Sequence, residues 1–101
     1  MCMNRKFICS EVLIEAIHDQ KNLILELPKG SQVTSALLSG KNICIFSKIF
    51  EDSKEDATDS FEFCLISTGV FIPLLYEYLI SVPRISENGD VAFYHLMYKQ
   101  L

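Results

Sequence analysis

The stretch VTSALLSGKNICIFSKIF, residues 33–50, decides the fold class because it reads as two β-strands joined by a tight turn. Mostly apolar runs span Val33–Leu38 and Asn42–Phe50, and Ser39-Gly40-Lys41 separates them. This spacing is typical of a short β-hairpin. Large apolar side chains occupy both parities of the second run, so we expect that strand to be buried on both faces.

The remainder of the chain shows further short alternating segments between turns. Leucines at positions 23, 25 and 27 alternate with their neighbours and stop at Pro28-Lys29-Gly30-Ser31, where proline and glycine end a ladder. The same alternation predicts strands over residues 61–66, 76–85 and 91–98. Asn88-Gly89 lies between the last two, and this pair favours a type I′ hairpin turn with two positive φ angles.

Residues 12–17 fit either a helical face or a strand, and their β-branched side chains favour a strand. That makes six or seven strands with short connections and no long amphipathic helix. The sequence therefore predicts an all-β fold, a single small antiparallel sandwich or barrel-like sheet.

The length allows one domain, which we place at residues 1–101. Residues 1–10 are expected to be an extension of it, and residues 51–60 an exposed acidic loop with five carboxylates and one lysine. This loop lacks the D-x-[DN]-x-[DN]-G pattern of a calcium site, so a solvated loop is the favoured interpretation. It offers no large apolar anchor, and we expect it to be dispensable for folding.

Composition limits the partners that the chain can bind. The formal net charge is −4, which argues against coating DNA. The longest apolar stretch, Gly69–Tyr76, is too short to span a bilayer and is interrupted by Pro73, so it reads as core. The N-terminus lacks the apolar region of a signal peptide, so we expect neither secretion nor a membrane partner.

No residue pattern points to a metal, a cofactor or a catalytic centre. The cysteines, at positions 2, 9, 44 and 64, occur singly within apolar segments and read as buried thiols. His18 and His95 lie far apart in the sequence and away from any cysteine pair. Nucleophilic catalysis needs a base and an orienting acid beside the nucleophile, and no such set is visible. We therefore expect a protein that is not an enzyme.

Three segments together resemble a family of small, functionally uncharacterised bacteriophage proteins. Residues 27–33 look like that family's proline-lysine-glycine turn, and residues 67–73 are similar to its glycine-threonine-glycine-histidine-proline segment. The closing hairpin, Tyr76–Ile80 with Phe93–Tyr98, resembles its last two strands, of which the final one contains a histidine. Ser67 replaces the first glycine, and Val70-Phe71 replace the histidine-proline pair. The resemblance implies a phage or prophage origin and an all-β domain, but no activity. With no signal peptide expected, we place such a protein in the cytoplasm of a bacterial host cell.

Seven residues are candidates for a ligand site. The turn Ser67-Thr68-Gly69 ends a strand with N–H groups that could hold an anion, and a plain turn is the alternative. Arg84 is either a snorkelling edge residue or an anchor for a phosphate or carboxylate. Tyr94 and Tyr98 belong to an alternating aromatic stripe that could stack on a base or on a second subunit. His95 has the same strand parity as its apolar neighbours. A core histidine is therefore the favoured interpretation, and a ligand-binding residue is the alternative.

These features suggest a non-enzymatic phage accessory protein that counters bacterial defence by sequestering a nucleotide signal. Two alternatives remain open, an inhibitor that binds a host defence enzyme and a minor virion component. We also expect a homo-oligomer built through the closing hairpin. Val91, Phe93 and Met97 are then the core face of its last strand, and Tyr94, Leu96 and Tyr98 are the outer face.

Overall fold

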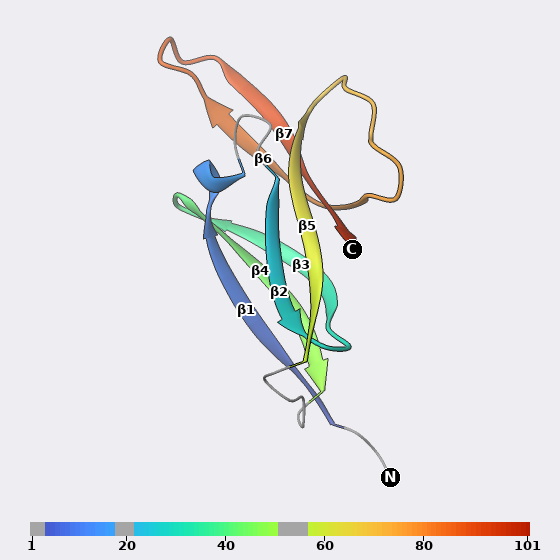
Figure 1. Cartoon of the computed structure of the whole chain (residues 1–101). Helices are drawn as coiled ribbons and strands as arrows, with labels where there is room; N and C mark the ends of the chain where they lie inside the picture. The colour runs from blue at the N-terminus through green and yellow to red at the C-terminus, as the bar shows by residue number, and fades with distance from the viewer. Residues whose placement is uncertain (1–3, 18–21, 51–56) are drawn as a thin grey trace.

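The computed structural model of the chain describes residues 4–17, 22–50 and 57–101. Within these ranges it has seven strands and one short 3-10 helix (Figure 1). The elements are β1 Arg5–Leu13, η1 Ile14–Ala16, β2 Leu23–Pro28, β3 Gln32–Ser39, β4 Asn42–Phe50, β5 Thr58–Ser67, β6 Glu77–Ile85 and β7 Val91–Gln100. The predicted all-β fold is confirmed.

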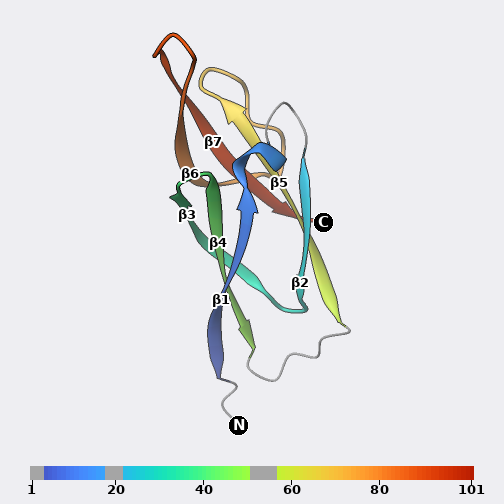
Figure 2. The same ribbon diagram turned by 90° about the vertical axis from the view of Figure 1, so that its left-hand side faces the viewer.

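The strands form two antiparallel sheets with the orders β1-β4-β3 and β2-β5-β7-β6. Figure 2 shows the two layers from the side, with β6 next to β3, which it contacts. The predicted β3-β4 hairpin is present: Ser39 lies opposite Asn42, and Gly40 in the turn has a φ of 60°. Among the described residues the sheets do not close into a barrel.

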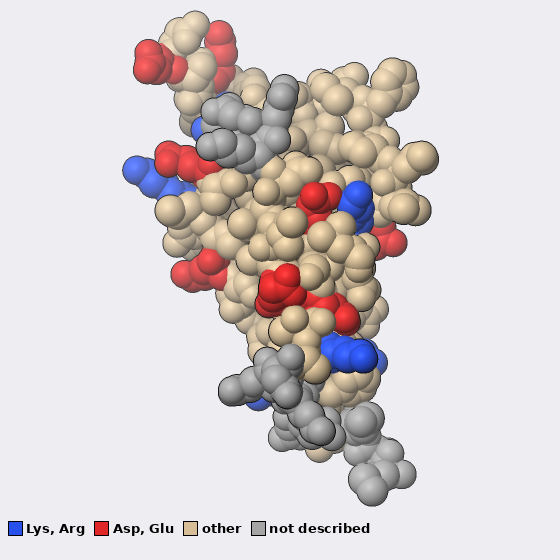
Figure 3. Space-filling view, viewed as in Figure 1, with Lys and Arg blue, Asp and Glu red and all other residues tan. Residues whose placement is uncertain are grey.

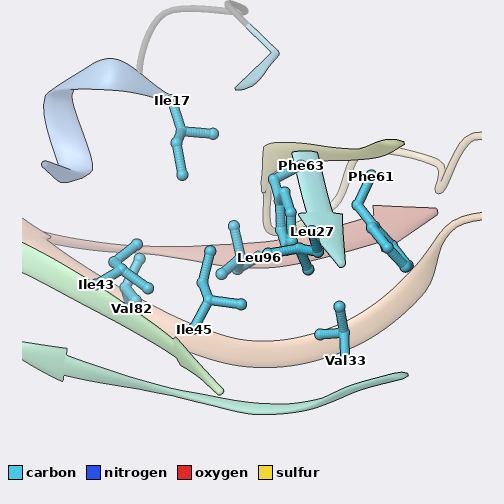
Figure 4. Packing of buried hydrophobic residues seen from close by; sticks show 9 residues of the cluster. All are labelled: Ile17, Leu27, Val33, Ile43, Ile45, Phe61, Phe63, Val82 and Leu96. Carbon is cyan, nitrogen blue, oxygen red and sulfur yellow. The ribbon is translucent and has the colours of Figure 1, made fainter. Parts of the chain in front are cut away.

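The core fills the space between the two sheets (Figure 4). β4 contributes Ile43 and Ile45, which are fully buried, and β5 contributes Phe63 from the opposite sheet. Six further side chains complete this cluster: Ile17, Leu27, Val33, Phe61, Val82 and Leu96. The alternation read from residues 23–27 is confirmed, because Leu27 faces this core and Glu26 faces outward.

Two expectations for the N-terminal region are wrong. Residues 5–10 are not an extension, because they belong to β1 and pair with β4 in continuous register from Arg5 opposite Phe50. The strand expected over residues 12–17 ends at Leu13, and η1 follows it. The reason is tertiary: the Ile14 N–H donates to the Lys41 carbonyl at 2.9 Å, and the short helix turns Ile17 into the core.

The expected acidic loop is shorter than predicted. Residues 51–56 lie outside the described ranges, but residues 58–60 belong to β5 and pair with β2. Small hydroxyl side chains explain the difference, since Thr58 and Ser60 both donate to the Glu26 carboxylate, at 3.0 and 2.7 Å.

The β6-β7 hairpin is present, but its turn is not of type I′. The central turn residues are Glu87 and Asn88, and the Gly89 N–H closes the turn by donating to the Ser86 carbonyl at 3.0 Å. Gly89 alone takes a positive φ, 87°, whereas Asn88 does not. Three-residue hairpin loops have this form, a turn followed by a left-handed glycine. The Asn-Gly pair therefore predicts the hairpin correctly, but the central residues of the turn lie one position earlier than predicted.

The faces of β7 are the reverse of those expected. Leu96 is fully buried between the sheets, with Tyr94 and Tyr98 beside it, while Phe93 is 54% exposed on the outer face. Register explains the reversal: Tyr98 lies opposite Phe63, an inward residue of β5. Both parities of β7 are apolar, so the sequence could not distinguish them, and a shift of one residue exchanges the faces.

Candidate functional site

The connection between β5 and β6 carries the largest exposed apolar surface of the described chain. We call residues 69–75 the apolar loop. Phe71 is 96% exposed, Leu74 89% and Leu75 84%, and Val70 and Ile72 are also more than half exposed. Figure 3 shows no charged side chain over this part of the molecule, at the upper right. The expectation that this stretch is core is therefore wrong.

Local chemistry explains why the apolar loop does not continue a strand. Gly69 takes a φ of 93°, and Pro73 has no N–H for a ladder. Leu75 also takes a positive φ, 74°, which is uncommon for a side chain of this size. The combination turns the chain away from the sheet before β6 begins.

Tyr76 fixes the end of the apolar loop to the outer face of the four-stranded sheet. Its ring packs on a second buried cluster, formed by Cys64, Ile66 and Met97. Its hydroxyl donates to the Glu62 carboxylate, and this bond holds the pKa of Glu62 below its usual value. Burial and the same bond raise the pKa of Tyr76. Lys99 lies over the Tyr76 ring, with 4.8 Å between its ammonium and the ring centre.

His95 lies on the same outer face, in a chain of hydroxyl groups. Its Nε2 lies 2.9 Å from Thr68 Oγ1, and its Nδ1 lies 2.8 Å from Ser81 Oγ. The Thr68 hydroxyl also bonds to the Phe93 carbonyl at 3.1 Å, so it donates there and accepts from Nε2–H. Ser81 Oγ also lies 2.8 Å from the Tyr78 hydroxyl, and either group can be the donor of that bond. Both ring nitrogens therefore have a hydroxyl partner, as expected for a structural histidine.

A hollow of about 380 Å³ lies between His95 and the apolar loop. Its lining is mainly apolar and includes no lysine or arginine; the residues are Ile66, Ser67, Gly69, Val70, Ile72, Tyr78, His95 and Met97. The turn before it offers few free donors to an anion. The N–H of Thr68 donates to the Phe93 carbonyl, and the N–H of Val70 to the Ser67 carbonyl.

The seven candidate residues divide among three places. Ser67, Thr68, Gly69 and His95 come together beside the apolar loop. Arg84 and Tyr94 line a separate hollow of about 430 Å³ near the β6-β7 turn. Tyr98 stands apart from both, where it stacks on Phe63 with 6.1 Å between the ring centres and donates to Glu77 at 2.9 Å.

The described residues contain no group of three histidine, cysteine or acidic side chains that could hold a metal ion. Burial raises the pKa of the Cys44 and Cys64 thiols, which makes them poor nucleophiles. Cys9 is exposed, contrary to expectation, because it faces outward from the edge strand β1. In the part of the chain that is described, no helix is long and apolar enough to cross a membrane.

Comparison with family models, with curated proteins and with solved structures finds no match to this chain. The resemblance to phage proteins stays a prediction. Within this site, the apolar loop is the feature that sequence reasoning missed, because the stretch was expected to be core. Its signal is present in the sequence, because the stretch is apolar without a period of two and contains both Gly69 and Pro73.

Proposed function

We propose that the protein is a non-enzymatic binding protein that attaches to a partner protein through the apolar loop. The observation that carries this proposal is the exposure of Phe71, Leu74 and Leu75, three large side chains within five residues that the chain leaves in water. Contiguous apolar surface of this kind marks interaction sites in proteins.

The size of the surface fits a protein interface. The five large apolar side chains of the loop expose on the order of 700 Å² together, if a full aromatic side chain counts for about 200 Å². The largest apolar patch of a typical monomer covers about 300–600 Å². One partner in a standard protein interface contributes about 800 Å². The loop alone therefore provides most of one side of such an interface.

A protein fits this surface better than a lipid bilayer does. The loop carries no lysine or arginine, and a net charge of −4 is repelled by anionic lipid headgroups. Irregular backbone is also tolerated poorly in hydrocarbon, because its polar groups lack partners there. A protein pocket can supply both the apolar contact and the missing hydrogen bonds.

Among the functions expected from the sequence, this surface favours the inhibitor that binds a host defence enzyme. Capture of a nucleotide in the hollow beside His95 is disfavoured, since no lysine or arginine lines it. Self-association through Tyr94 and Tyr98 loses its basis, because both rings pack against the core. In the phage setting that the resemblance implies, the loop would cover a functional surface of the host enzyme.

The test compares two double variants with the wild-type protein. Phe71→Ser with Leu74→Ser removes the exposed loop side chains. Phe7→Ser with Leu37→Ser is the matched control, because these residues are 63% and 58% exposed on the three-stranded sheet. Each protein is immobilised on a resin and incubated with bacterial cell extract. The extract proteins that the resin retains are then quantified by mass spectrometry.

We expect one or a few proteins to be retained by the wild type and the control and lost, at least about ten-fold, from the loop variant. Equal retention by all three proteins contradicts the proposal. Light scattering on the purified proteins tests whether the partner is instead a second copy of the chain. A wild-type dimer that only the loop variant converts to a monomer would replace the host protein with a second copy of the chain.

A further inference from the structure

The free edge of β1 differs from the other strand edges of the two sheets. Natural sheets protect their edges with bulges, prolines or short strands. β3 and β6 each contain a bulge, β6 also contains Pro83, and these two strands contact each other. β2 has six residues and ends at Pro28, whereas β1 has nine residues without proline, glycine or a bulge. Among the described edge strands, β1 alone therefore presents a long and regular edge.

The pairing of β1 with β4 fixes which of its main-chain groups face this edge. The Ile14 N–H donates to the Lys41 carbonyl, and these two residues continue the β1-β4 register. Hydrogen-bonded pairs alternate along an antiparallel ladder, so the even-numbered residues of β1 bond to β4. The N–H and carbonyl groups that point to the free edge are then those of Arg5, Phe7, Cys9, Glu11 and Leu13.

The edge of β1 is also open along its length. Figure 1 shows β1 at the left margin of the molecule, and in Figure 2, where this side faces the viewer, no described strand lies in front of it. The segments outside the described ranges have three, four and six residues, so each is shorter than the nine residues of β1. An added strand of matching length must therefore come from another molecule.

The order of side chains along β1 makes its edge complementary to a second copy of itself. Consider two antiparallel β1 strands related by a two-fold axis at Ile8. Arg5 then lies opposite Glu11 of the second copy, and Phe7 lies opposite Cys9 of the second copy. Opposite charges at facing positions stabilise a strand pair, and like charges destabilise it. The symmetry makes each of these contacts occur twice.

Other positions of the two-fold axis match the side chains less well. Residues that face the edge must lie opposite one another, so the axis always passes through a residue of β1. With the axis at Cys9, Phe7 lies opposite Glu11, and Arg5 lies opposite Leu13. With the axis at Phe7, Arg5 lies opposite Cys9, and Glu11 has no β1 residue opposite it. Only the axis at Ile8 places the arginine opposite the glutamate.

The side chains at this edge are able to make these contacts. Arg5 Nη1 donates to Gln32 at 3.3 Å and the guanidinium lies over the Phe50 ring, but a guanidinium has five N–H donors, so others remain for a carboxylate. Glu11 is exposed. Phe7 is 63% exposed within its own chain, so contact with a second copy removes apolar surface from water.

We propose that the protein forms a two-fold symmetric dimer in which the free edges of two β1 strands pair antiparallel. The two three-stranded sheets then become one continuous sheet with the order β3-β4-β1-β1-β4-β3. Main-chain hydrogen bonds supply the affinity, as in other cases of strand addition, and the contacts between Arg5 and Glu11 set the register. The apolar loop joins two strands of the other sheet, so this interface is independent of the proposed function.

Charge reversal tests the partner and the register together. The wild type should be a dimer at high micromolar concentration by light scattering. Arg5→Glu and Glu11→Arg each place like charges opposite one another, and each should weaken dimerisation roughly ten-fold or more. An equal mixture of the two variants should form a heterodimer, because each then meets the opposite charge. Lys41→Glu, at the end of the same sheet but away from the β1 edge, is the matched control and should leave the dimer intact.

A covalent cross-link tests the register directly. In a Cys2→Ser background, Phe7→Cys places a thiol opposite Cys9 of the second copy, at a Cα separation of about 5.5 Å that a disulfide can span. Oxidation with diamide should then give a covalent dimer on a non-reducing gel. Leu37→Cys, 58% exposed on β3 of the same sheet, is the matched control and should give none.

Several results would overturn the proposal. One is a wild-type protein that stays monomeric at high micromolar concentration, and another is a dimer that neither charge variant weakens. Cross-linking of the Cys2→Ser protein without Phe7→Cys would place Cys9 opposite itself and contradict the register. The loop variant Phe71→Ser with Leu74→Ser should remain a dimer. If it alone becomes monomeric, the copies meet through the loop, whereas a dimer that no longer retains extract proteins separates the two interfaces.

Discussion

β4 and the apolar loop are two stretches of similar hydrophobicity with opposite fates. In β4, Ile43 and Ile45 are completely buried between the sheets. In the loop, Phe71 and Leu74 are almost completely exposed. β4 is the central strand of its sheet, with β1 and β3 on either side, whereas the loop crosses from β5 to β6 and has no strand beside it. Neighbours in the fold, and not apolar content, decide whether a segment is buried.

The comparison bears on function because folding removes the apolar side chains of β4 from water but leaves those of the loop in water. Burial of β4 stabilises the folded chain. The side chain of Phe71 gains nothing from the fold of its own chain, and this is the basis of our proposal that another molecule covers the loop.

The largest expected effect comes from truncating one residue of each segment. Ile45→Ala should reduce the free energy of unfolding by about 3 kcal/mol, because it leaves a cavity in the core. Leu74→Ala should change it by less than about 0.5 kcal/mol, because the side chain is in water. Urea denaturation of the purified variants measures both. Comparable losses would show that the loop packs against the domain.

A second pair of variants sharpens the comparison within one strand. Tyr98→Ser should cost about 2 kcal/mol, since the ring stacks on Phe63 and its hydroxyl is bonded to Glu77. Phe93→Ser should leave the unfolding midpoint almost unchanged, because that ring is on the outer face of β7. Thermal melts followed by circular dichroism distinguish the two. The opposite ranking would restore the faces expected from the sequence.

Much of the fold was predictable because it depends on local signals. The alternation around Leu25, the turn at Gly40 and the Asn-Gly pair each mark a strand or a hairpin within a few residues. What failed depended on partners distant in the sequence. The pairing of Arg5 with Phe50 and the inward turn of Ile17 are set by tertiary contacts.

The candidate site was predictable in part. Thr68 and His95 were both singled out, and the structure brings them within hydrogen-bond distance through the pairing of β5 with β7. Ser81 was not singled out, because a serine on a strand carries no signal until its cross-strand neighbour is known. The structure places Ser81 opposite His95.

Tyr76 lies at the boundary between the exposed loop and the buried sheet, and a smaller effect is expected there. Tyr76→Phe keeps the ring over Cys64 and Met97 but removes the hydrogen bond to Glu62. We expect a loss of about 1 kcal/mol in the free energy of unfolding, the usual value for one hydrogen bond. Protease digestion should also cleave the loop faster in this variant. Unchanged stability and cleavage would show that the ring alone anchors the loop.

An effect that is absent at neutral pH is a dependence of stability on alkaline pH that arises from Tyr98. Burial and the hydrogen bond to the Glu77 carboxylate raise the pKa of Tyr98 from 10.0 to about 12. The fold therefore favours the neutral phenol. The stabilisation is complete below pH 10 and is lost as the pH rises through 12. The ultraviolet absorbance of tyrosinate measures the titration, and Tyr98→Phe should remove one late-ionising group while Tyr78→Phe leaves it in place. If the late phase persists unchanged in Tyr98→Phe, the inward position of this ring, and with it the assignment of the faces of β7, would be wrong.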